Sequence, residues 1–304
     1  MLPVPKINLA SCTETWEALG TTWTLELPTE SDSAITLGVR ACLETFEQKY
    51  SRFRPTSEVS VLNQTKRILN PSTTLVDMLR YGVTLYQYSN ERFNILTGHI
   101  QDARGYNANL TFQAGPGTEP DSLPNPTHDL HIRGSQIELR AGSVDLGGFG
   151  KGYAIDVVHQ YIQQNFQLPW YLINGGGDIF VHNTTREPIA VYLQHPTRPN
   201  VYTHRLPDLR GALAVSSPYQ RFWQTKNTNQ TYSHLIEPDA ESESSPSCAV
   251  RAPTACEADA LATIYYLLRA ESITSSLLPR RPYLLVYPDG TCRRHPQFGA
   301  TVLA

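Results

Sequence analysis

A glycine-rich stretch is the first place where this sequence could do chemistry. Residues 143–163 run SVDLGGFGKGYAIDVVHQYIQ, with glycines at 147, 148, 150 and 152. The apolar residues before the glycines alternate as at the end of a strand, and those after them recur at helical spacing. A helix N-terminus exposes unpaired N–H groups and the positive end of its dipole, and Lys151 adds a cation. The stretch is either a seat for phosphate or a tight turn that needs small residues.

Two common nucleotide-binding motifs do not match this stretch. A P-loop requires Gly-x4-Gly-Lys-Ser/Thr, but Asp145 occupies the position of the first glycine and Gly152 follows the lysine. The dinucleotide fingerprint Gly-x-Gly-x-x-Gly is not met in its usual register either. A nucleotide that binds here must therefore be held in another way.

A helix near the C-terminus carries hard oxygen donors among apolar residues. Thr254 and Glu257 fit a capping box, which predicts that the helix starts at Thr254. Asp259 and Thr263 are four residues apart and therefore share one face. A carboxylate and a hydroxyl suit Mg²⁺. The alternative is structural: Thr263 bonds to its own helix backbone, and Asp259 favours the positive end of the helix.

The elements that must position these residues follow from periodicity. Apolar spacing predicts helices over 33–50 and 72–89, and either a strand pair or an edge strand over 16–27, with a bend at Gly20. Later segments predict strands, and the glycines at 175–177 mark a turn or a close backbone approach. Helices early and antiparallel strands late predict an α+β fold of antiparallel sheets layered with helices, in two packed subdomains, rather than a doubly wound parallel sheet.

Composition narrows the class of protein. The chain has 304 residues and a net charge of −3, without a basic stripe, so we expect no nucleic-acid partner. Its five cysteines are scattered and odd in number, which predicts reduced thiols.

No apolar run is long enough to span a membrane. Leu9 to Cys12 resembles the end of a lipoprotein signal, but no apolar region precedes it, so a cytoplasmic location is expected.

Eight sets of residues, in order along the chain, resemble the ApbE-type FAD:protein FMN transferases. The resemblance covers nearly the whole chain and implies one domain over residues 1–304, with a possible short flexible N-terminus over 1–14. The sets are 19–23 (LGTTW), 51–54 (SRFR) with 57–63, 93–98, 144–156, 174–178, 216–219, 233–238 and 252–263.

The resemblance implies a reaction and a site. Such enzymes bind FAD and a divalent metal, usually Mg²⁺, and transfer the FMN half of FAD to a threonine or serine hydroxyl of an acceptor protein, releasing AMP. By position, the Gly148 carbonyl and the side chains of Asp259 and Thr263 would hold the metal. His234 would be the general base for the acceptor hydroxyl. The implied FAD contacts are Leu19, Phe53, Arg92, Phe93, Asn94, Asp145, Lys151 and Ile236.

Departures from the family pattern leave other activities open. The Thr-Gly that usually follows the histidine is missing at 237–241, and a usual Thr-Ser-Gly is replaced at 215–218. Asn94 replaces a common aspartate, and Ala262 stands where some members have another carboxylate. The alternatives are a non-catalytic FAD-binding flavin carrier and an FAD pyrophosphatase, in which water replaces the acceptor hydroxyl. Asp145 and Asp156 are also possible acceptors for ribose or ring N–H groups.

Overall fold

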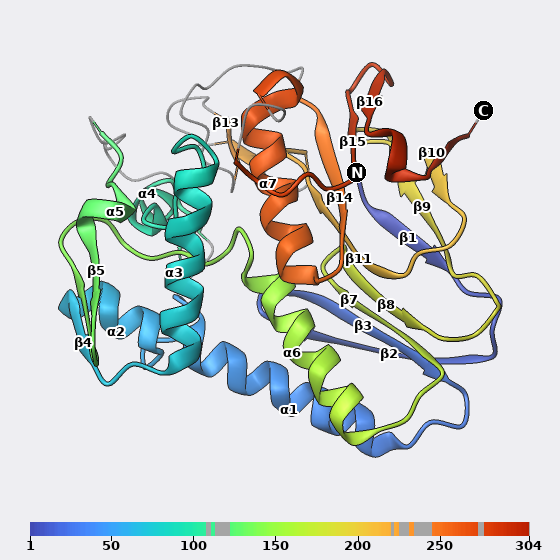
Figure 1. The fold of residues 1–304 in the computed structure, drawn as a ribbon, viewed down its shortest axis with the longest axis horizontal. Coiled ribbons are helices and arrows are strands. Elements are labelled where there is room, and N and C mark those ends of the chain that lie inside the picture. Colours follow the sequence, from blue (N-terminus) through green and yellow to red (C-terminus); the bar gives the residue numbers. More distant parts are fainter. Residues whose placement is uncertain are drawn as a thin grey trace.

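The centre of the fold is an eight-stranded sheet in which every neighbouring pair is antiparallel (Figure 1). The computed structural model describes residues 1–107, 111–112, 122–219, 222–224, 231–233, 245–272 and 277–303. In order across the sheet, the strands are β16 (Cys292–Arg294), β15 (Tyr283–Val286), β14 (Ser247–Ala252), β11 (Gly211–Ser216), β8 (Asp178–Asn183), β7 (Trp170–Gly175), β3 (Thr21–Pro28) and β2 (Ser11–Ala18).

This sheet separates two hydrophobic cores, because successive side chains of a strand point to opposite faces. In β7, Tyr171 and Ile173 belong to one core and Leu172 to the other. The same alternation occurs in β11, where Leu213 lies opposite Ala212 and Ala214. Both faces of the central strands are therefore buried.

A four-stranded sheet covers one face of the central sheet. Leu193 and Leu206 of this second sheet share a core with Leu172 and Val181 of the central one. A short 3₁₀ helix, η2 (Pro296–Phe298), buries Phe298 in the same core. In order, the strands are β1 (Pro3–Lys6), β9 (Ala190–Gln194), β10 (Tyr202–Leu206) and β17 (Thr301–Val302).

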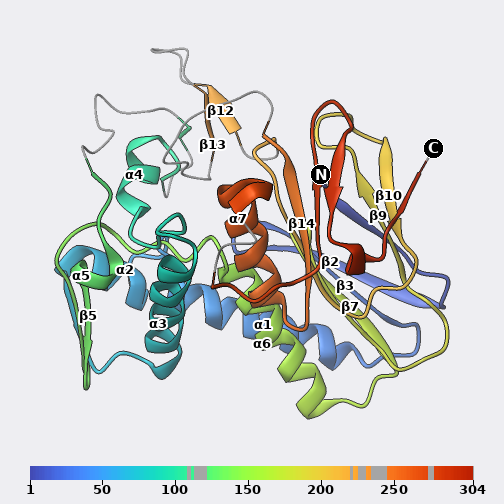
Figure 2. The same ribbon diagram turned by 45° about the horizontal axis from the view of Figure 1, so that its top comes forward.

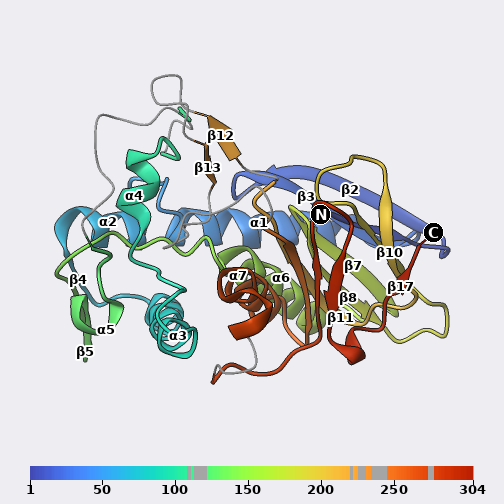
Figure 3. The same ribbon diagram turned by 90° about the horizontal axis from the view of Figure 1, so that it is seen from above.

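Three long helices cover the other face. They are α1 (Ser33–Tyr50), α6 (Gly150–Asn165) and α7 (Ala255–Ser272). The helix α6 packs between α1 and α7, and α7 packs on β11 and β14 (Figure 1). Seen from above, α1 extends from the sheets to the smaller, helical part of the protein (Figure 3). Side chains from all three helices share one core with the sheet.

The smaller part contains helices and a three-stranded sheet. A separate two-stranded pair, β12 (Phe222–Gln224) and β13 (Thr231–Ser233), lies beyond one end of α7, near α4 (Figure 2). The elements of the smaller part are α2 (Glu58–Thr65), β4 (Arg67–Leu69), α3 (Thr73–Tyr88), α4 (Gly98–Ala103), α5 (Pro126–Asp129), β5 (Leu130–Arg133) and β6 (Gln136–Leu139).

The predicted α+β class with antiparallel sheets is confirmed, as are its most periodic elements. The helix predicted over 33–50 has these bounds, and its buried residues are those of the predicted face. Ser72 and Ser57 cap the N-termini of α3 and α2. The strand pair around Gly20 is the β2–β3 hairpin, whose two turn residues both have positive φ, as in a type I′ turn.

One sequence expectation was wrong. Residues 143–146 do not end a strand; apart from an isolated bridge at Ser143 they form an irregular segment. The predicted cap at Thr254 is confirmed, because its hydroxyl accepts a hydrogen bond from Glu257 N and α7 begins at the next residue, Ala255. Within residues 1–14, β1 pairs with β9, β2 begins at Ser11, and Met1 is buried.

No helix within the described ranges has both the length and the mean hydropathy needed to cross a lipid bilayer.

Candidate active site

Charged side chains from three separate elements meet at the N-terminal end of α6. Lys151 comes from the first turn of α6, Asp178 is the first residue of β8, and Asp259 lies in α7. The Lys151 Nζ is 3.0 Å from Asp178 Oδ2 and 3.3 Å from Asp259 Oδ2. Both carboxylates are almost completely buried, whereas the Lys151 side chain is 25% exposed. A ligand would therefore reach this cluster from the side of Lys151.

The Asp259 carboxylate is held by both helices that meet here. Its Oδ2 accepts a hydrogen bond of 3.0 Å from Gly152 N in the first turn of α6. Burial raises its pKa to about 7, with a further contribution from the negative charge of Asp178; Lys151 and the Gly152 N–H oppose the rise. A buried carboxylate with a raised pKa, next to a second carboxylate, is an arrangement that a bound cation would stabilise.

Thr263 lies one turn beyond Asp259 on the same buried face of α7, as the spacing predicts. Its hydroxyl is 2.9 Å from Ser216 Oγ at the end of β11. The hydroxyl therefore bonds across to the sheet. Ser216 belongs to the segment 215–218 that departs from the family pattern, so this departure lies directly against a predicted metal ligand.

The close approach of α6 and α7 depends on Gly152. A Cβ added at Gly152 would lie 2.2 Å from the backbone oxygen of Ala255, which is too close for any side chain. At the same crossing, the Asp156 carboxylate accepts hydrogen bonds of 2.8 Å from Ala255 N and 2.9 Å from Cys256 N. Asp156 therefore caps α7 and is already occupied, contrary to the expectation that it accepts from a ligand.

We expect Gly152→Ala to lower both stability and activity. The added methyl group must push α7 away from α6, and overpacking of this kind costs about 1–3 kcal/mol in free energy of unfolding. The shift also breaks the hydrogen bond between Gly152 N and Asp259. Chemical denaturation measures the loss, and Gly150→Ala in the same helix is the control, because a Cβ there makes only an ordinary contact of 3.6 Å with Leu146 Cβ and the backbone φ of Gly150 is not positive. A Gly152→Ala protein as stable as the Gly150→Ala control would contradict the predicted crowding.

The loop before α6 is held by residues from the smaller part of the protein. The Asn63 side chain donates to Val144 O (3.0 Å) and accepts from Val144 N (2.7 Å), in place of a strand partner. Asp145 Oδ1 accepts from Gly147 N at 2.7 Å, and Asp145 Oδ2 is 2.8 Å from Arg52 Nε. At the place where a strand was predicted, side-chain contacts therefore hold the loop.

Arg52 connects Asp145 to Phe53, another predicted FAD contact. Its guanidinium also bonds to Asp102 Oδ1 and to Tyr106 O, each at 2.7 Å. The Arg52 side chain is only 7% exposed, and its guanidinium carbon lies 4.1 Å from the centre of the Phe53 ring. Phe53 and Asp145 are thus brought together on one side of the glycine turn.

Phe93 lies beneath the predicted metal ligand Gly148. A Cβ at Gly148 would be 2.6 Å from the Phe93 ring, so only glycine fits there in this arrangement. The Asn94 amide already has partners within the protein: it donates to Pro124 O (2.7 Å), in a distant segment, and accepts from Leu96 N (2.8 Å) in its own loop. Phe93 is buried, and Arg92 is half-buried beside it. Of these side chains, the Phe93 ring is the one that lies against the glycine turn.

Leu19 lies in the β2–β3 turn, where its backbone is bonded to α1. Its N–H donates to Glu47 Oε2 at 3.2 Å, and Glu47 also pairs with Arg54. The neighbouring residue Thr21 packs against Gly176 in the turn between β7 and β8. Gly176 and Gly177 both have positive φ, as a two-residue hairpin turn requires, and this turn delivers Asp178 to the cluster.

The structure identifies two residues to which the sequence assigned no role, Asp178 and Ser216. The signal for Asp178 was its position directly after the three glycines at the start of a buried strand. The predicted base His234 and the predicted FAD contact Ile236 lie outside the described residues. They follow β13, whose Tyr232 ring lies 5.0 Å from the guanidinium carbon of Arg104.

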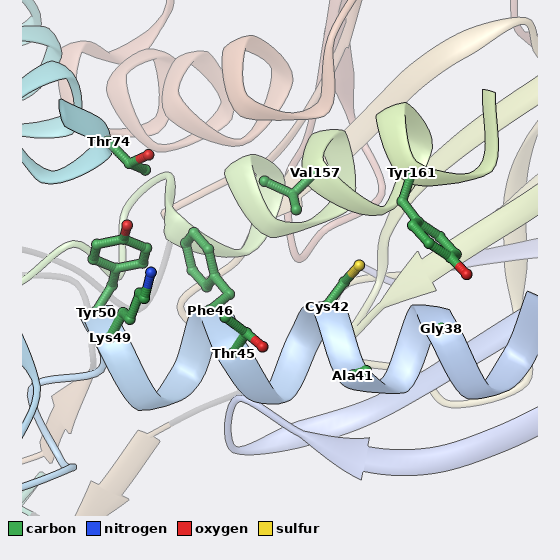
Figure 4. Close-up of a pocket in the computed structure, with 10 residues that line it drawn as sticks. All are labelled: Gly38, Ala41, Cys42, Thr45, Phe46, Lys49, Tyr50, Thr74, Val157 and Tyr161. Carbon is green, nitrogen blue, oxygen red and sulfur yellow. The ribbon is translucent and has the colours of Figure 1, made fainter. Parts of the chain in front are cut away.

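A groove of about 410 Å³ lies away from this cluster, between α1 and α6 (Figure 4). Cys42 and Phe46 line it from α1, and Val157 and Tyr161 from α6. Gly38 makes room for Tyr161, since a Cβ at Gly38 would lie 1.8 Å from the Tyr161 hydroxyl. The groove shares no lining residue with the predicted site.

Solved structures define the class of fold. The ApbE protein of Thermotoga maritima matches with a TM-score of 0.79 and 18% identity over 95% of this chain and 98% of that one. The flavin transferase ApbE from Vibrio cholerae matches with a TM-score of 0.74 and 20% identity, over 95% and 98% of the two chains. The fold is therefore that of the ApbE structures.

Sequence comparison defines the family. The model of the ApbE family matches residues 19–282, and the chain belongs to this family. A curated relative from Vibrio cholerae, named FAD:protein FMN transferase, is 22% identical over 78% of this chain and 72% of its own length. A relative of the same name from Haemophilus influenzae is 22% identical over 76% of this chain and 71% of its own.

Proposed function

We propose that this protein transfers the FMN half of FAD to a threonine or serine hydroxyl of an acceptor protein, in a Mg²⁺-dependent reaction that releases AMP. The observation that carries the proposal is the buried cluster of Asp259, Asp178 and Lys151 beside the glycine turn, in a chain of the ApbE family. The name of the curated relatives, FAD:protein FMN transferase, supports the transfer of FMN from FAD to a protein.

The residues of the cluster fit a hard divalent cation. Two buried carboxylates already share one ammonium group, and burial of Asp259 together with the charge of Asp178 makes the ionised form of Asp259 costly. A ligand set made only of oxygen donors favours a hard cation such as Mg²⁺ over softer transition metals, which prefer sulfur or nitrogen ligands. Asp259, the Thr263 hydroxyl and the Gly148 carbonyl would hold the ion, which when bound would neutralise negative charge on the pyrophosphate.

The chain's own residues bind and orient the pyrophosphate. Lys151, partly exposed at the mouth of the cluster, donates to a phosphate oxygen. Two backbone N–H groups of the turn already donate within the protein: Gly152 N to Asp259 and Gly150 N to Leu146 O. The Lys151 ammonium is therefore the side-chain donor that this turn can present to a phosphate. Phe53 and Asp145, held beside the turn by Arg52, contact the FAD molecule. Positioning and charge neutralisation are the main requirements of such a displacement.

The transfer step exchanges one P–O bond for another. The acceptor hydroxyl oxygen attacks the phosphorus of the FMN half, and the bond between the two phosphates breaks. The electron pair of this bond leaves with AMP, and the hydroxyl proton passes to His234. A histidine suits this role because its ordinary pKa is close to neutral pH.

Product analysis tests the proposed function against the two alternatives. The protein is incubated with FAD, Mg²⁺ and a purified candidate acceptor, or the acceptor with its Thr/Ser attachment site changed to Ala. We expect AMP and a covalently fluorescent acceptor band that the Ala variant loses. Equal amounts of AMP and free FMN without labelled protein would show an FAD pyrophosphatase. Tight FAD binding with neither product would show a flavin carrier.

A further inference from the structure

Lys151 lies between two carboxylates that differ in their other partners. Asp259 Oδ2 also accepts from Gly152 N, at 3.0 Å. Asp178 Oδ1 accepts from Val215 N, at 3.3 Å. Among the described residues, Asp178 Oδ2 accepts no hydrogen bond, although it is buried, and the Lys151 ammonium 3.0 Å away is its ion-pair partner. Asp178 therefore depends on Lys151 more than Asp259 does.

This difference matters once a cation approaches Asp259. A divalent ion and the Lys151 ammonium compete for the same carboxylate, and in a buried site their repulsion is strong. Lys151 can move away from Asp259, but leaving both carboxylates would be costly, because the Asp178 carboxylate would then be an unpaired buried charge. The shorter of its two ion pairs, to Asp178, provides this group.

We propose that Asp178 is a positioning residue that retains Lys151 when Asp259 binds the divalent cation, so that Lys151 stays beside the pyrophosphate and does not neutralise the metal ligand. This inference rests on the proposed metal site at Asp259. Asp178 acts through Lys151 and does not itself touch the substrate.

Charge arithmetic in the cluster gives an ordered prediction. With Asp178, Asp259 and Lys151 ionised, the wild type carries −1, Lys151→Met −2, Asp178→Asn 0, and the double variant −1. A more negative cluster attracts a divalent ion more strongly. Lys151→Met should therefore bind best and Asp178→Asn worst, with the wild type and the double variant between them. Removal of a group that orients a metal ligand typically weakens metal binding 10–100-fold. We therefore expect Asp178→Asn to weaken Mn²⁺ binding at least tenfold, and the added Lys151→Met to restore it to near the wild-type value.

The experiment measures Mn²⁺ affinity from the EPR signal of free Mn²⁺ in these four proteins. Asn at 178 keeps an oxygen for Val215 N, so the fold is expected to hold, and circular dichroism checks it. Glu14→Gln, which removes one negative charge from an exposed ion pair with Arg40, is the control. Tighter Mn²⁺ binding by Lys151→Met is a second expected result that does not require the Asp178 variant to fold.

The outcomes separate this inference from the proposed metal site. If the wild type binds Mn²⁺ and Asp259→Asn does not, the metal site stands. Wild-type affinity in Asp178→Asn would then overturn the inference alone, and so would a double variant as weak as Asp178→Asn, because Asp178 would act directly and not through Lys151. If Asp259→Asn binds Mn²⁺ as the wild type does, the metal site and the inference both fall.

Discussion

Replacement of Asp259 by alanine is expected to abolish Mg²⁺-dependent release of AMP from FAD. Asp259 is the buried carboxylate on which α6, α7 and Lys151 converge, and of the three proposed ligands, Asp259, Thr263 and Gly148, it is the charged one. Loss of metal-assisted charge stabilisation costs several kcal/mol of barrier, which corresponds to a loss of about 100-fold or more. The rate of AMP release, measured across a range of Mg²⁺ concentrations, gives the size of the effect.

The control for this variant removes a carboxylate from a helix surface. Glu44→Ala changes an exposed residue of α1 and is expected to leave the rate unchanged. Thr263→Val should lower the rate as well, whereas Thr263→Ser keeps the hydroxyl and should retain most of it. Unchanged turnover in Asp259→Ala would remove Asp259 from the metal site.

Replacement of Arg52 by methionine is expected to lower the free energy of unfolding by about 2–4 kcal/mol. The guanidinium is nearly buried and pairs with both Asp145 and Asp102, and removal of one partner leaves charge without compensation. The same change frees Asp145 and the Phe53 ring, so we also expect a higher KM for FAD. Chemical denaturation and steady-state kinetics measure the two effects.

Arg54 provides a matched control two residues away. It pairs with Glu47, but its side chain is about half exposed, so Arg54→Met should cost less than about 1 kcal/mol. Arg52→Lys keeps the positive charge, but the lysine ammonium lacks the planar, forked guanidinium that reaches three acceptors at once. The stability of the Arg52→Lys protein should therefore fall between those of the wild type and Arg52→Met. Equal losses in Arg52→Met and Arg54→Met would show that the pair with Asp145 contributes little.

The elements with clear periodicity could be predicted from the sequence. The apolar spacing over 33–50 is sufficient to define α1, because one face of the helix is buried along its whole length. The i, i+4 spacing likewise placed Asp259 and Thr263 on one buried face of α7. Both predictions depend on geometry within a single element.

Interactions between distant segments could not be predicted in this way. The strand expected at 143–146 is absent because the Asn63 side chain, about eighty residues earlier, takes both backbone groups of Val144. Asp178 was visible only as the residue after three glycines, and its pairing with Lys151 depends on how the β7–β8 turn meets α6. Asp156 could not be identified as the cap of α7, because nothing local to Asp156 reports a helix a hundred residues later.

A crystal soaked with FAD and Mn²⁺ tests the central claim most directly, by the anomalous signal of manganese. The proposed site predicts a manganese peak within about 2.5 Å of oxygen atoms from Asp259, Thr263 and Gly148, with the pyrophosphate beside it and Lys151 paired to Asp178. A manganese peak at another place would contradict the proposed site. So would FAD bound away from the glycine turn, with Lys151 still bridging Asp178 and Asp259.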